Sequence, residues 1–173
     1  KQALQQGVAA HKEGKLEEAE RLYRAILQSQ PLHADANHNL GVLLVSVNKV
    51  DAALPFFKTA LEANPKIEQF WLSYINALIN EKQFENAKLV IEQAKKQNVI
   101  GINPPQEQLT SLLENYQNGR FSDAEELAVF ISNEFPKHEF SWKVLGVVFE
   151  ATGRTSEALD AKQTAIALSP QDA

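Results

Sequence analysis

The sequence predicts an all-α protein built as a stack of five helix-turn-helix units. Alanine recurs at intervals of 34, 34, 37 and 34 residues, in the series Ala19, Ala53, Ala87, Ala124 and Ala158. Proline follows four of these alanines at a constant spacing, in the series Pro31, Pro65, Pro136 and Pro170. A third series precedes the alanines: Gly14, Asn48, Lys82, Gly119 and Gly153. A fixed period of this length indicates repeated helical hairpins, which bury their apolar faces against their neighbours.

The three series assign a role to each part of a unit. Glycine and asparagine tolerate the left-handed backbone that ends a helix, so the third series marks the turn inside each hairpin. Alanine lets two helices approach closely, and proline stops the second helix. Each unit therefore reads as helix, tight turn, helix and stop. We expect repeats at 1–33, 34–67, 68–101, 105–138 and 139–170, with an inserted connector at 102–104 and the start of a sixth repeat at 171–173.

The units carry these signals in order along the chain. The first unit turns at Gly14 and stops at Pro31, and the second turns at Asn48 and stops at Pro65. The third turns at Lys82 but has Val99 where its closing proline would fall. The fourth turns at Gly119 and stops at Pro136, and the fifth turns at Gly153 and stops at Pro170. We therefore expect four hairpins that are followed by a proline and one, the third, that is not.

The one irregular interval lies between the third and fourth units. Three residues are added there, within the stretch 99–105, which reads Val-Ile-Gly-Ile-Asn-Pro-Pro. We expect Asn103 to cap the following helix and Pro104 to occupy its first turn. The stack is expected to be perturbed at this point, so that repeats one to three form one regular block and repeats four and five form a second.

The register of large and small residues resembles the tetratricopeptide repeat. The second unit carries the resemblance in Leu40, Gly41, Leu44, Ala53, Phe57, Ala60 and Pro65. The fifth carries it in Trp142, Leu145, Gly146, Phe149, Ala158, Ala165 and Pro170. The resemblance covers essentially the whole chain and implies a right-handed superhelical solenoid. It also implies a concave groove, lined by the first helix of each repeat, that binds peptide segments.

Composition and charge exclude several functions. The chain has 173 residues, a net charge of −5 and 17 basic residues scattered among 22 acids, without the basic stripe that nucleic acids or anionic membranes require. Cysteine is absent, and the four histidines fall on different units, so no thiolate or histidine metal site is expected. No phosphate-binding loop or nucleophile elbow is present. We therefore expect no enzymatic activity in this chain, no cofactor, and neither nucleic acid nor membrane as a partner.

Family geometry, carried over by position, gives the residues of the expected groove. Uncharged amide and hydroxyl groups dominate its middle part, and such groups can both donate to and accept from a peptide backbone. Trp71 and Trp142 occupy equivalent places and serve either as packing residues between helices or as platforms for a ligand. The candidate groove residues are Asp35, His38, Asn39, Val42, Gln69, Leu72, Ser73, Asn76, Asn80, Leu113, Tyr116, Gln117, Lys143 and Val147.

The function expected from this reading is a scaffold that binds a partner protein or an extended peptide in the groove, in the cytoplasm. An alternative is the substrate-recruiting arm of a larger glycosyltransferase or sulfotransferase, because phrases such as Asn39-Leu40-Gly41 resemble bacterial arrays that precede transferase domains. A further alternative is a self-assembling array. Neither end of the chain shows the polar cap that terminal repeats normally carry, and exposed apolar ends favour self-association.

Overall fold

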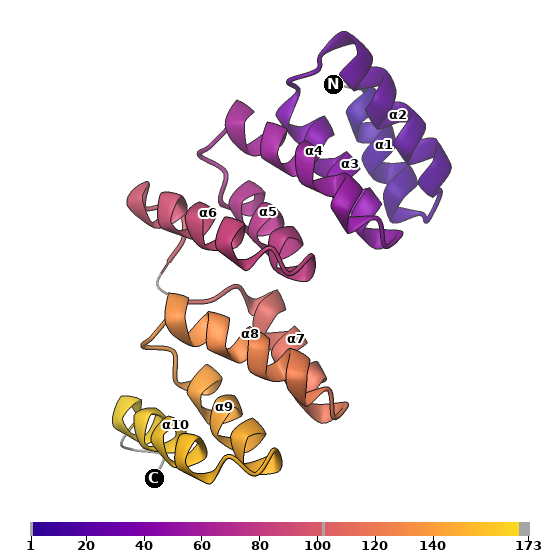
Figure 1. Cartoon of the computed structure of the whole chain (residues 1–173). Helices are drawn as coiled ribbons and strands as arrows, with labels where there is room; N and C mark the ends of the chain where they lie inside the picture. Colours follow the sequence, from indigo (N-terminus) through magenta and orange to yellow (C-terminus); the bar gives the residue numbers. More distant parts are fainter. Residues whose placement is uncertain (1, 102, 170–173) are drawn as a thin grey trace. The chain divides into compact units, whose positions relative to one another are not determined.

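The chain forms helical hairpins throughout the part that the structure describes (Figure 1). The structure is a computed structural model that describes residues 2–101 and 103–169. Within these ranges there are helices and no strands, which confirms the all-α class and the five helix-turn-helix units. The helices are α1 (Gln2–Lys12), α2 (Leu16–Ser29), α3 (Ala34–Ser46), α4 (Val50–Ala63), α5 (Glu68–Asn80), α6 (Phe84–Lys96), α7 (Gln106–Gln117), α8 (Phe121–Glu134), α9 (Glu139–Ala151) and α10 (Thr155–Leu168).

Each hairpin turns at the residue that the sequence series marks. Gly14, Asn48, Lys82, Gly119 and Gly153 all have a positive φ, between 54° and 77°. The turn satisfies carbonyl groups at the end of the first helix: in the first hairpin the N–H of Gly14 donates to the His11 carbonyl, and the N–H of Lys15 donates to the Ala10 carbonyl. This pairing is the usual left-handed ending of a helix, and the prediction of the turns is confirmed.

The third repeat ends differently because it lacks its proline. Asn98 takes a positive φ of 54°, and the N–H of Val99 donates to the Ala94 carbonyl. The second helix α6 therefore ends in the same kind of left-handed turn that ends the first helices. An asparagine replaces the proline as the stop, because its short polar side chain tolerates this conformation better than most residues.

The recurring alanines are buried in the core. Ala19, Ala53, Ala87 and Ala124 are completely buried, and Ala158 is 4% exposed. Side-chain sizes are also matched between the two helices of a hairpin. A Cβ atom built on Gly41 would lie 2.6 Å from Cε1 of Phe57, and one built on Gly7 would lie 2.7 Å from Cε1 of Tyr23. Glycine on the first helix therefore makes room for an aromatic ring on the second.

The third and fourth repeats match side-chain sizes with other residues. At the equivalent positions the third repeat has Ile75 and Ile91, and the fourth has Leu112 and Ala128; all four are completely buried. A medium pair, or a large residue opposite a small one, fills the space that glycine and an aromatic ring fill in the first two repeats.

The contacts divide the chain into two compact units, residues 1–100 and 101–173. The division falls inside the irregular interval, where the segment between α6 and α7 contains no helix from Gln97 to Pro105, apart from Ile102, which is not described. The expected cap is wrong in detail, because Pro105 precedes the first residue of α7 and Asn103 lies further upstream. The expected sixth repeat at 171–173 lies outside the described residues.

Candidate functional site

The first helices of successive repeats adjoin one another within each unit. In residues 1–100, α3 contacts both α1 and α5, and in residues 101–173 α7 contacts α9. The candidate groove residues of the first unit therefore come from two adjoining helices: Asp35, His38, Asn39 and Val42 from α3, with Gln69, Leu72, Ser73, Asn76 and Asn80 from α5. Those of the second unit are Leu113, Tyr116 and Gln117 from α7, with Lys143 and Val147 from α9.

A row of polar side chains joins α3 to α5. The Nε2 atom of His38 lies 2.9 Å from the Oγ atom of Ser73, a hydrogen bond between residues 35 positions apart. Ser73 Oγ also accepts a hydrogen bond from the side-chain amide of Gln69 at 3.2 Å. Three of the predicted residues are thus brought into one network, which holds the two first helices in a fixed relation at this face.

Aromatic rings hold the imidazole of His38 in place. Its ring centroid lies 4.8 Å from that of Phe70 and 5.8 Å from that of Phe57. Burial by these neighbours lowers the pKa of His38, and the effect outweighs nearby polar groups, including Asp35, that raise it. The imidazole is therefore neutral at neutral pH, and the face around it is an uncharged polar surface.

The candidate groove residues of the first unit differ in their exposure to solvent. Asp35, Val42, Gln69 and Asn80 are exposed, and Asn39 is half-buried. Asn76, one of the residues expected to line the groove, is only 9% exposed. All five residues from Ile75 to Ile79 are buried, so this part of α5 is buried on all its sides and helical periodicity does not identify an open side.

The corresponding face of the second unit is more apolar. Leu113 on α7 is 39% exposed, and Tyr116 packs with Phe121 at a ring-centroid distance of 6.2 Å. The ammonium group of Lys143 on α9 pairs with the carboxylate of Glu139, one turn earlier. Val147 is half-buried. Among the candidate groove residues, α3 and α5 supply four amides, whereas α7 and α9 supply Gln117.

The two tryptophans pack and hydrogen-bond within the fold. The indole of Trp71 is 2% exposed and donates to the Pro65 carbonyl at 2.8 Å, and that of Trp142 donates to the Pro136 carbonyl at 3.0 Å. Asn37, at the equivalent position of the second repeat, donates to the Pro31 carbonyl at 2.9 Å. The shared position supplies an N–H group to the carbonyl of the closing proline, which supports the packing interpretation.

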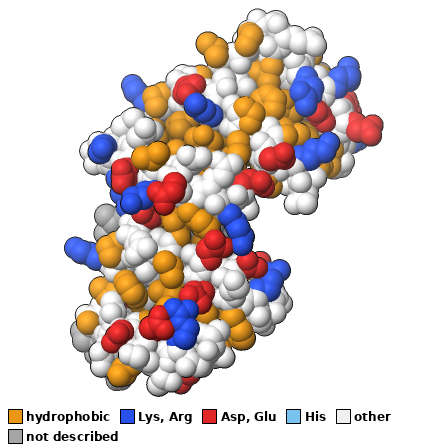
Figure 2. Space-filling model, viewed as in Figure 1, with side chains coloured by type: hydrophobic (Ala, Val, Ile, Leu, Met, Phe, Trp, Pro, Cys, Tyr) orange, Lys and Arg blue, Asp and Glu red, His pale blue; other side chains and the backbone are white. Residues whose placement is uncertain are grey.

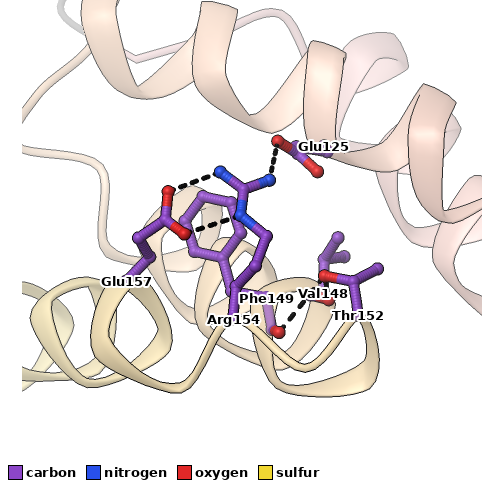
Figure 3. Close-up of polar contacts among 6 residues, drawn as sticks. All are labelled: Glu125, Val148, Phe149, Thr152, Arg154 and Glu157. Atoms are coloured by element: carbon purple, nitrogen blue, oxygen red, sulfur yellow. Dashed lines mark hydrogen bonds and ion pairs between the residues drawn. The ribbon is translucent and has the colours of Figure 1, made fainter.

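An ion-pair cluster that the sequence interpretation missed lies in the second unit (Figure 3). The guanidinium of Arg154 bonds both carboxylate oxygens of Glu157 at 2.7 and 2.5 Å, and it bonds Glu125 of α8 at 2.5 Å. It also lies over the ring of Phe149 on α9, with its carbon 4.3 Å from the centroid. Arg154 thereby connects α8, α9 and α10, and its hydrogen bonds lower the pKa of Glu157.

Charges of both signs are interspersed over the surface that Figure 2 shows, with hydrophobic side chains between them. Within residues 2–101 and 103–169, no three histidine, aspartate or glutamate side chains converge as a metal site would require. Over the same residues, no helix combines the length and apolar character needed to span a bilayer.

Paired antiparallel helices repeated along the chain define the class of α-helical repeat proteins. The chain belongs to the tetratricopeptide repeat family, whose sequence model matches residues 4–66 and 113–173. The unmatched stretch between them contains α5 and α6, together with the connector and the start of α7. Among curated proteins, none matches the sequence.

Solved structures share the fold at low sequence identity. The crystal structure of MamA is 15% identical, with a TM-score of 0.62 over 98% of this chain and 91% of that one. YrrB, described as a tetratricopeptide repeat protein with an unusual peptide-binding site, is 18% identical, with a TM-score of 0.60 over 98% of this chain and 86% of that one. A tetratricopeptide repeat protein from Parabacteroides merdae is 16% identical, with a TM-score of 0.57 over 96% of this chain and 64% of that one.

Proposed function

We propose that this protein is an interaction scaffold that binds an extended peptide of a partner protein across the first helices α3 and α5. The observation that carries the proposal is the polar row in which Gln69 and His38 both bond the hydroxyl of Ser73. A fixed, neutral row of this kind suits a peptide backbone, because it offers donors and acceptors without demanding a charged ligand.

The surroundings of this row support the same ligand. Asn39 stands beside His38 and is half-buried, so its amide can reach a bound chain without being free to move. Val42 is 37% exposed one turn further along α3 and supplies an apolar contact for a peptide side chain. Members of the tetratricopeptide repeat family generally mediate protein–protein interactions, and the structurally similar YrrB is described as having a peptide-binding site.

The test begins with a peptide selected from a random displayed library against the whole chain. Its affinity is measured by fluorescence polarisation for the unaltered protein and for the double variant Asn39→Ala, Gln69→Ala. We expect the double variant to weaken binding at least tenfold, because both amides lie on the proposed face.

The matched control is the double variant Gln28→Ala, Asn133→Ala, which removes two exposed amides from second helices α2 and α8. Its affinity should remain within a factor of two of the unaltered protein. Equal affinity in both double variants, or a loss of affinity only in the control, would show that the face formed by α3 and α5 is not the binding site.

Self-association is a second candidate, favoured by the apolar surface of α10. Leu159 is 56% exposed and Ile166 is 53% exposed, and they lie two turns apart on the same side of this helix. A mass that rises with concentration in light scattering, and that becomes constant in the variant Ile166→Glu, would support this candidate. A monomer at all concentrations would exclude it. The role of a recruiting arm for a transferase would use the same peptide-binding face and rests on sequence resemblance alone.

A further inference from the structure

A cavity in the first unit lies away from the polar row of His38, Ser73 and Gln69. It has a volume of about 530 Å³, and α4, α5 and α6 all line it. Trp71 and Tyr74 of α5 contribute aromatic surface, and Leu61, Leu89 and Val90 contribute aliphatic surface. On α5, Trp71 is two residues from both Gln69 and Ser73, which places it about 200° around the helix from each. The cavity and the polar row are therefore on opposite sides of α5.

The outer surface of α6, like that of α4, is uncharged at two positions where the other second helices carry charged residues. At these positions the residues are Glu18 and Arg21 on α2, Asp123 and Glu126 on α8, and Glu157 and Asp160 on α10, whereas α4 has Ala52 and Pro55. The equivalent residues of α6 are Asn86 and Leu89, which are neutral, and Leu89 is 58% exposed. Both line the cavity. The family pattern also fails to match this part of the chain, which contains α5 and α6.

The chemistry of the walls selects one kind of occupant. The aromatic and aliphatic side chains suit an apolar side chain, and the amides of Gln93 on α6 and of Gln97 just after this helix can bond the backbone that carries it. The two charged groups in the wall, Lys58 and Glu62, pair with each other at 3.9 Å and so favour neither sign of charge. A volume in this range is typical of a site for a small ligand or a few residues of a peptide. Hydrophobic side chains reach the surface over α4 and α6 in Figure 2.

We propose that this cavity is a second peptide-binding site, which takes a leucine-like side chain from an uncharged extended segment of a protein partner. The side chain packs against Tyr74 and Leu89, beside the largely buried indole of Trp71, and the amides of Gln93 and Gln97 bond the flanking backbone. A partner that presents two separated segments could then occupy the first-helix face and this cavity at the same time, which would raise its overall affinity through effective concentration.

The test is an NMR titration of the whole ¹⁵N-labelled chain with the acetylated and amidated pentapeptide Ser-Ala-Leu-Ala-Ser. We expect a saturable shift of the Trp71 indole N–H signal, with the Trp142 signal unchanged as an internal control. The pentapeptide Ser-Ala-Asp-Ala-Ser should bind at least tenfold more weakly. No saturable shift of Trp71, equal shifts of both tryptophans, or equal affinity for both pentapeptides would each overturn the proposal.

Two variants separate this site from a change in folding and from the proposed groove. Leu89→Glu introduces the kind of charge found at the equivalent Glu126 and should weaken the leucine pentapeptide at least tenfold. Leu32→Glu alters an exposed leucine between α2 and α3, outside this cavity, and should leave the affinity unchanged. The groove variant Asn39→Ala, Gln69→Ala should also leave the affinity for the leucine pentapeptide unchanged. The experiment therefore tests the proposal for this cavity separately from the proposal for the groove. Unaltered binding by Leu89→Glu would overturn the proposal.

Discussion

At the scale of single residues, the fold depends on pairs of side chains whose sizes complement one another across each hairpin. Gly41 and Phe57 form the tightest such pair, because a methyl group on Gly41 would overlap the ring. Tyr23 fills the same position in the first repeat opposite Gly7, but it adds a hydroxyl group to a completely buried ring. These residues lead to separate predictions about packing and about buried polarity.

Replacing Gly41 by alanine should lower the free energy of unfolding by about 1–3 kcal/mol, because the added methyl group overpacks a filled interior. Urea denaturation measures the change. Gly101→Ala is the matched control, since a Cβ atom there meets nothing within 4 Å. An equal loss of stability in both variants would contradict the explanation by packing.

Replacing Tyr23 by phenylalanine should raise the free energy of unfolding by about 1 kcal/mol, because a buried hydroxyl without a partner carries a desolvation penalty of this order. The hydroxyl of Tyr23 has no hydrogen-bond partner among the described residues, and burial raises the pKa of the phenol. Phe57 shows that the equivalent position accepts phenylalanine. A lower melting temperature for Tyr23→Phe would show that the hydroxyl is satisfied.

The buried imidazole of His38 makes stability depend on pH. Its pKa in the folded protein lies below the ordinary value of about 6.5, so the unfolded chain takes up a proton more readily than the folded one. The stabilising contribution is present above pH 6.5 and is lost as the pH falls through the range between the two pKa values. NMR titration of the His38 ring should give a midpoint below 6.5, and a midpoint at or above this value would disagree with the burial.

At the scale of helices, one side chain connects three elements of the second unit. Arg154 bonds Glu125 on α8 and Glu157 on α10 while it lies over Phe149 on α9. Bidentate pairing and contact with a ring hold the guanidinium in one place, so this cluster differs from a mobile surface pair. An ordinary pair is provided by Lys58 and Glu62, whose atoms lie 3.9 Å apart within α4.

Replacing Arg154 by glutamine should lower the melting temperature clearly more than replacing Lys58 by glutamine. The first change removes contacts between three helices, whereas the second removes an exposed pair within a single helix, and such pairs contribute little. Calorimetry of both variants at one pH and one salt concentration measures the difference. Equal melting temperatures would indicate that the Arg154 cluster does not stabilise the packing of α8, α9 and α10.

At the scale of the whole molecule, the two compact units predict separate local unfolding. Each unit has its own completely buried residues, such as Leu40 and Ile91 in residues 1–100 and Leu112 and Ile131 in residues 101–173. In repeat proteins, stability is approximately a sum over repeats and their neighbouring interfaces, so damage spreads mainly to adjacent repeats.

Replacing Ile131 by alanine should therefore reduce amide protection in residues 103–169 far more than in residues 2–63. The loss within the second unit should be about 2–5 kcal/mol, as for other truncations of buried isoleucine. Hydrogen exchange followed by mass spectrometry resolves the two regions. Val129→Ala, on the same helix but at a position that is 39% exposed, is the matched control. An equal loss in α1 to α4 and in α8 would show that the two units unfold together.

The repeat period and the left-handed turns inside the hairpins follow from the sequence alone, because their signals are short and act on the backbone nearby. Glycine or asparagine at a turn and proline after a helix have the same effect whatever surrounds them. The residues of α3 and α5 expected in the groove came from the geometry of the resembled family, and their role stays a prediction. The period did not predict the stop at Asn98, since Lys95, Lys96, Gln97 and Asn98 all fit a continuing helix.

The contacts between side chains of different helices could be known only from the tertiary structure. The bond between His38 and Ser73, the Arg154 cluster, the burial of Asn76 and the cavity beside Leu89 depend on how helices pack. Their partners are separated by one repeat or more, or come from three helices at once. Helical periodicity identifies the side of a helix that faces inward, but side-chain volumes and interhelical packing determine which atoms meet.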